Sequence, residues 1–134
     1  MPNAGDKPGR KMTLEVLLLT YLVASFLHFI QDAEYARAYP LSGWSSTSSV
    51  YITWLAISAI GLLGYLIHRS TLRWVGQMVL CLYAVVGFDG LFHYTRAPFS
   101  TYSRAMNISI GVQVVMATIL LGYLLATINR PAAR

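Results

Sequence analysis

Four long apolar runs, separated by shorter polar stretches, dominate the pattern of hydrophobic and polar positions along the chain. The runs cover residues 12–30, 50–67, 74–93 and 105–128. A helix of about 20 residues, at a rise of about 1.5 Å per residue, crosses the hydrocarbon core of a bilayer. We therefore predict an all-α integral membrane protein in which four transmembrane helices form an up-down bundle.

The first eleven residues differ from the rest, because proline, glycine and charged residues fill them. This composition is typical of a short flexible tail. The apolar run that follows has no convincing cleavage site at its end, so we interpret it as a retained first span and not as a signal peptide. We predict a basic cytoplasmic tail over residues 1–11 and a single four-helix transmembrane domain over residues 12–134.

The overall composition supports a membrane environment. Hydrophobic residues make up 56% of the chain and charged residues only 11%, against about 25% charged in an ordinary soluble domain. The net charge of +5 is modest, and the basic residues flank the apolar runs. We therefore expect the lipid bilayer as a partner and no nucleic acid. A single cysteine, Cys81, excludes an intrachain disulfide and thiol chemistry that needs a cysteine pair.

Lysine and arginine are unevenly shared between the two sets of polar stretches. The N-terminal tail, the turn between the second and third runs, and the C-terminal stretch hold seven of them, whereas the other two loops hold three. Basic loops stay in the cytoplasm. We therefore predict that both termini are cytoplasmic, in a multi-pass protein of a bacterial-type inner (plasma) membrane.

Two acid–imidazole stretches close the first and third runs: His28 with Asp32, and Asp89 with His93. Residues four apart on an α-helix lie on one face, so each stretch presents a stacked pair. The first and third spans run in parallel, and the order of acid and imidazole is reversed between them. We therefore expect His28 to meet Asp89, and Asp32 to meet His93, at the outer ends of the spans. Ionisable groups inside a span are costly, which makes them candidates for function.

The first interpretation of these residues is an outward-facing metal site. Imidazole and carboxylate ligands suit a transition metal such as zinc, copper or iron. The predicted ligands are His28, Asp32, Asp89 and His93. The residues predicted to support them from outside the ligand set are Glu34, Tyr35, Tyr94 and Tyr102. Haem is disfavoured, because the two histidines differ in depth by about a turn and each stacks on a carboxylate.

Other interpretations of the same residues stay open. An Asp–His chain can relay protons across a membrane, and hydrogen-bonded pairs can simply lock two helices together. An Asp–His base could also serve an enzyme acting on a lipid-like small molecule, although the sequence indicates neither a nucleophile nor a substrate. Whether the protein is an enzyme is therefore left open.

Glycines in the last three spans favour a further class, a small accessory subunit of a larger membrane complex or a homo-oligomer. Glycine lets transmembrane helices approach closely. The glycines concerned are Gly61, Gly64, Gly87, Gly90, Gly111 and Gly122. The lone polar residues Gln77 and Gln113 are predicted to make interhelical hydrogen bonds, with Glu15 at a similar depth to Gln77.

Overall fold

A computed structural model of the chain describes residues 8–36 and 46–128. Its elements are α1 (Pro8–Tyr35), α2 (Thr47–His68), α3 (Arg73–Val86), the 3₁₀ turn η2 (Asp89–Phe92), α4 (His93–Arg96), the 3₁₀ turn η3 (Phe99–Thr101) and α5 (Arg104–Ile128). Within these ranges the structure contains helices and no strand. The all-helical prediction is confirmed for this part of the chain.

Four helical segments in the described ranges are long and apolar enough to cross a membrane. They are Thr13–Tyr35, Thr47–His68, Arg73–Arg96 and Arg104–Ile128. α1 begins at Pro8, so residues 8–11 of the predicted flexible tail are helical, and it continues past the predicted span to Tyr35. Large apolar side chains such as Leu19, Ile52 and Leu82 are more than half exposed on the outside of the bundle, as lipid-facing residues would be.

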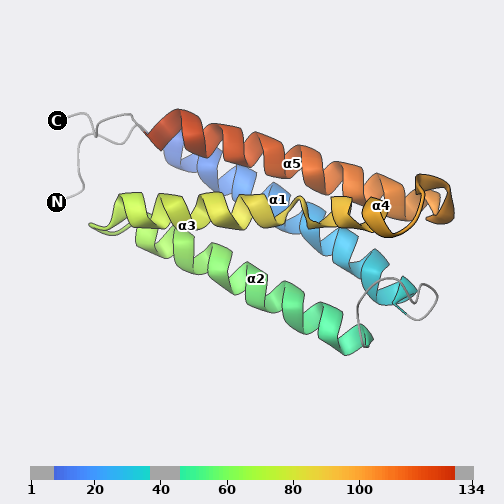
Figure 1. The fold of residues 1–134 in the computed structure, drawn as a ribbon. Helices are drawn as coiled ribbons and strands as arrows, with labels where there is room; N and C mark the ends of the chain where they lie inside the picture. The colour runs from blue at the N-terminus through green and yellow to red at the C-terminus, as the bar shows by residue number, and fades with distance from the viewer. Residues whose placement is uncertain (1–7, 37–45, 129–134) are drawn as a thin grey trace.

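The four candidate spans run in alternating directions along the chain, with α4 continuing the course of α3, as Figure 1 shows. α2 packs against α1 and α3, and α5 packs against α1 and α3. The helices therefore form a ring in which α1 and α3 lie across the bundle from each other. The turn of residues 69–72 lies at one end, here called the turn end. The end of α1, α4 and the start of α5 lie at the other, here called the site end (Figure 1).

The side of α1 that faces the centre carries both apolar and polar residues. Leu14, Tyr21, His28 and Asp32 recur at helical spacing and are all buried. Tyr21 reaches across the bundle, where its hydroxyl donates a hydrogen bond to the backbone oxygen of Tyr83 on α3 (3.1 Å). The same stripe that builds the apolar core thus carries an imidazole and a carboxylate to the site end.

Glycines let α2 and α3 pack very closely. A Cβ atom placed on Gly76 would lie 2.1 Å from the backbone nitrogen of His68 and 2.7 Å from the oxygen of Gly64. Gly61 likewise makes room for the ring of Tyr83. By contrast, a Cβ atom on Gly111 would meet nothing within 4 Å, and the same holds for Gly122. The expected close approach is therefore made by glycines of the α2–α3 hairpin and by Gly87, where a Cβ atom would lie 2.6 Å from the Tyr21 hydroxyl and 2.7 Å from the Cβ atom of Ala117.

The sequence predicts a continuous helix from residue 74 to residue 93, but the structure shows a break in this span. α3 ends at Val86, and the chain continues through η2 into α4. Glycine at positions 87 and 90 weakens the helix by about 1 kcal/mol each relative to alanine. In addition, the Asp89 carboxylate accepts a hydrogen bond from the Gly90 amide (2.8 Å), which competes with the helical pattern.

Both buried glutamines make interhelical hydrogen bonds, as predicted. Gln77 on α3 donates to the backbone oxygen of Leu124 on α5 (2.6 Å), and not to Glu15. Gln113 on α5 donates to the carboxylate of Asp89 (2.9 Å). These bonds connect α5 to the third span at both ends of the bundle.

Candidate metal centre

The first two candidate ligands come from one turn of α1. His28 and Asp32 are four residues apart in a regular helix and are buried, with 0% and 4% of their surface exposed. The Nε2 atom of His28 lies 3.7 Å from the Oδ2 atom of Asp32. The i,i+4 spacing thus places both groups side by side, as the sequence predicts.

His93, the first residue of α4, completes the group from across the bundle. Its Nε2 atom lies 3.1 Å from the Oδ1 atom of Asp32. Its ring stands nearly perpendicular to that of His28, with centroids 5.5 Å apart. One ligand atom from each of the three residues falls within 4.8 Å of the others. The expected meeting of Asp32 and His93 is therefore present.

Ser109 on α5 holds the His28 ring in place. The Ser109 hydroxyl donates its hydrogen to the backbone oxygen of Met106 (2.8 Å), and its oxygen lies 3.3 Å from Nδ1 of His28. With the hydroxyl hydrogen directed at Met106, this contact corresponds to the tautomer in which Nδ1 of His28 donates. In a neutral imidazole the other nitrogen, Nε2, then carries a lone pair.

Two buried atoms of this group have no hydrogen-bond partner in the structure. They are Nε2 of His28 and Oδ1 of Asp32. Although Oδ1 lies within ion-pair distance of His93, the geometry falls outside that of a hydrogen bond. Buried polar atoms are normally paired, because an unpaired one loses about 1–3 kcal/mol of solvation. Each of these two atoms could therefore bond to a ligand.

The expected pairing of His28 with Asp89 is not what the structure shows. The carboxylate of Asp89 accepts hydrogen bonds from the Gly90 amide and from Gln113, and Asp89 is not among the residues whose ligand atoms gather at the centre. With about three residues per turn in a 3₁₀ segment, positions four apart no longer stack. The break after Val86 therefore turns His93 toward Asp32 and Asp89 toward α5.

The four residues predicted to support the ligands have different positions. Tyr102 contacts His93, with ring centroids 5.6 Å apart and its hydroxyl donating to the His93 backbone oxygen (2.8 Å). Tyr94 donates to the side chain of Asn107. Glu34 is exposed and Tyr35 partly exposed at the end of α1. Tyr102 therefore contacts a ligand residue, as predicted.

Sequence reasoning missed two contributors to the site. Ser109 supports the His28 ring, and Gly90 passes so near that a Cβ atom there would lie 3.1 Å from Nε2 of His28. Ser109 and Gln113 are four residues apart and both buried on α5. That spacing was a usable signal, because two polar residues on one face of an apolar span indicate a buried polar contact.

The geometry suits a metal ion. Two imidazole nitrogens and a carboxylate are ligands for zinc, iron and related ions. In a tetrahedral site with bonds of about 2.0–2.1 Å, ligand atoms are about 3.3 Å apart. In the structure, one ligand atom from each of the three residues lies within 4.8 Å of the others. The side chains would therefore have to move closer together to form a three-ligand site.

A second polar cluster lies at the turn end. The hydroxyl of Tyr65 on α2 donates a hydrogen bond to Glu15 on α1, and Arg69 donates to the same hydroxyl (3.1 Å). Arg69 also lies 3.8 Å from the Glu15 carboxylate, and both side chains are about half exposed. This cluster connects α1 to the end of α2.

Comparisons with protein-family models, with curated proteins and with solved structures find no match for this chain. The function is therefore argued from the residues of the site itself.

Proposed function

We propose that this chain is a multi-pass membrane protein that binds a divalent transition-metal ion through His28, Asp32 and His93. The four candidate spans support the membrane location. The distribution of lysine and arginine favours cytoplasmic termini, which would place the metal site near the outer face of a bacterial-type inner membrane.

The observation that carries this proposal is the convergence of three ligand groups, of which His28 and Asp32 are buried and His93 is partly exposed. Nε2 of His28 and Oδ1 of Asp32 are buried and have no hydrogen-bond partner. Ser109 contacts the far side of the His28 ring, as groups outside the ligand set orient histidines in metal sites. A lock between two helices would not need a lone pair aimed at a shared centre.

The ligand set also limits the choice of ion. Two nitrogens and one carboxylate favour zinc(II) or iron(II) over copper(I), which prefers sulfur. Three protein ligands leave a coordination position for water or a substrate, as in catalytic zinc sites. The site would therefore be able to exchange its ion or activate a bound water molecule.

The main test is a matched pair of aspartate variants purified in mild detergent. Asp32→Asn should reduce bound zinc, measured by elemental analysis after incubation and desalting, from about one ion per chain to a small fraction. Asp89→Asn makes the same chemical change at the same end, on a residue that contacts Gln113, and should retain the ion. Equal zinc content in both variants, or none in the wild type, would overturn the proposal.

Proton handling is the second candidate, and the 3.1 Å separation of Asp32 and His93 favours it. If the wild type binds no metal, proton uptake in proteoliposomes should still depend on Asp32. The same purification examines the accessory-subunit interpretation, because a constant stoichiometric membrane partner would co-purify with the wild type and with both variants.

A further inference from the structure

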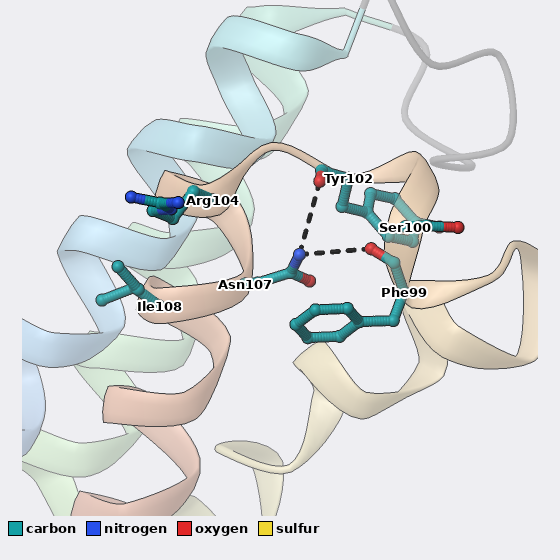
Figure 2. Close-up of a pocket in the computed structure, with 6 residues that line it drawn as sticks. All are labelled: Phe99, Ser100, Tyr102, Arg104, Asn107 and Ile108. Atoms are coloured by element: carbon teal, nitrogen blue, oxygen red, sulfur yellow. Dashed lines mark hydrogen bonds between the residues drawn. The ribbon is translucent and has the colours of Figure 1, made fainter.

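An open pocket of about 400 Å³ lies at the site end, between η3 and the start of α5. Figure 2 shows the residues that line it, which are Phe99, Ser100, Tyr102, Arg104, Asn107 and Ile108. The pocket is separate from the candidate metal centre, although Tyr102 contributes to both.

Asn107 builds the pocket and has no polar atom left for a ligand. Its Nδ2 group donates to the backbone oxygens of Phe99 (3.2 Å) and Tyr102 (3.3 Å), the two dashed lines in Figure 2. Its Oδ1 atom accepts from the hydroxyl of Tyr94 (2.8 Å). These bonds fasten the η3 segment to α5 and fix the shape of the pocket.

Arg104 is the charged residue in the lining. It is exposed, and within the described part of the chain no ion pair or hydrogen bond of its side chain is found. It is also the first residue of α5, where the partial positive charge of a helix N-terminus adds to that of the guanidinium. The pocket therefore offers a net positive potential with no internal counter-charge.

Exposed apolar side chains also line the pocket where it meets the outside of the bundle, together with the exposed Ser100. Phe99 is 64% exposed and Ile108 is 58% exposed. Ile108 lies one helical turn after Arg104 on α5 (Figure 2). A cation therefore sits beside exposed apolar side chains at the end of a candidate membrane span, which is the depth where lipid headgroups and acyl chains meet.

We propose that this pocket binds the headgroup of an anionic phospholipid. The phosphate lies against Arg104, and the first carbons of an acyl chain lie against Phe99 and Ile108. The volume is at the small end of the range for ligand sites, so it suits a headgroup and not a whole lipid. This site is additional to the metal centre, and it shares with the proposed function only the location in a membrane.

The test uses the full chain reconstituted in vesicles of equal phosphatidylglycerol and phosphatidylcholine, followed by native mass spectrometry of the lipids retained. The wild type should retain phosphatidylglycerol in preference. Arg104→Gln should lower that preference about fivefold, as expected for the loss of one basic residue near a membrane surface. Arg73→Gln is the matched control, because Arg73 also begins a helix but lies outside the pocket.

Three results would overturn the proposal. Unchanged retention in Arg104→Gln would show that Arg104 does not hold the lipid. Equal losses in both arginine variants would indicate general charge attraction. Displacement of the lipid by inorganic phosphate at low millimolar concentration, with no effect of Phe99→Ala on lipid retention, would identify a site for free phosphate instead.

Discussion

Polar and charged side chains gather at both ends of the bundle, and the two gatherings differ in exposure and in pairing. At the turn end, Glu15 and Arg69 are about half exposed and bonded to Tyr65. At the site end, His28 and Asp32 are almost fully buried, and each has an atom without a hydrogen bond. The side chains at the turn end are hydrogen-bonded to one another, whereas the buried pair at the site end keeps two atoms without a hydrogen bond.

This contrast teaches where to look for function in a small apolar bundle. Exposed ion pairs contribute little and are screened by salt. Buried unpaired groups are expensive and persist only when something else stabilises them. An ion at the site end would supply that stabilisation, and no such ligand is required at the turn end. The following predictions test the contrast, from the largest expected effect to the smallest.

The largest difference in zinc affinity is expected between a variant that lacks one histidine of the site end and one that lacks the histidine of the turn end. His28→Gln should weaken zinc binding by at least about 100-fold, because a direct ligand is lost and the three-residue set cannot close. His68→Gln, at the turn end, should leave zinc affinity within about twofold of the wild type, since His68 lies outside the ligand set. Zinc competition titrations in detergent measure both. Similar zinc affinities for the two variants would contradict the proposal that the metal binds at the site end.

A smaller loss is expected when the support of His28 is removed. Ser109→Ala should weaken zinc binding about tenfold, in line with other residues that orient metal-binding histidines. Thr118→Val is the control, because Thr118 is an exposed α5 residue that also donates to a backbone oxygen of its own helix. If both variants bind zinc like the wild type, the assigned role of Ser109 is wrong.

The next effect concerns the space beside His28. Gly90→Ala should lower zinc affinity several-fold, because the added methyl group would lie 3.1 Å from Nε2 of His28 and 3.2 Å from Ile110. Gly111→Ala adds the same group where it meets nothing within 4 Å and should not lower affinity. The same titration serves here, and tighter binding by Gly90→Ala would contradict the close approach.

The smallest effect is expected at the turn end. Arg69→Gln should lower the melting temperature slightly at low salt and not at all at about 0.5 M salt, because exposed charges are screened. Bound zinc should not change. Thermal melts in detergent at two salt concentrations measure this. A decrease that persists at high salt would show that the turn-end cluster behaves like the buried one.

Much of this architecture could be predicted from the sequence, because most of the chain forms regular helices. The apolar runs predicted the four spans, and the i,i+4 spacing predicted that His28 and Asp32 lie together, because α1 is unbroken around them. The contact between Asp32 and His93 was also predicted. Each of these inferences needed only helical periodicity and parallel spans.

The remaining features depend on competition between local and tertiary interactions. The Gly90 amide donates a hydrogen bond to Asp89 just after α3 ends. Gln113 on α5 donates a second hydrogen bond to the same carboxylate, which therefore bonds to α5 and not to a histidine. Periodicity alone does not indicate where a helix with two glycines breaks. The spacing of Ser109 and Gln113 indicates a buried polar contact on α5, but the partner of Ser109, His28, is identified only by the packing of α5 against α1.

The close packing at Gly76 has a consequence for how the protein is made. With 2.1 Å between a hypothetical Cβ atom and the His68 backbone, α2 and α3 meet through residues close in sequence, and such contacts form early. His28 and His93, by contrast, are separated by about half of the chain. We therefore expect the α2–α3 hairpin to form early during synthesis, and the proposed metal site to form only after His93 has been synthesised.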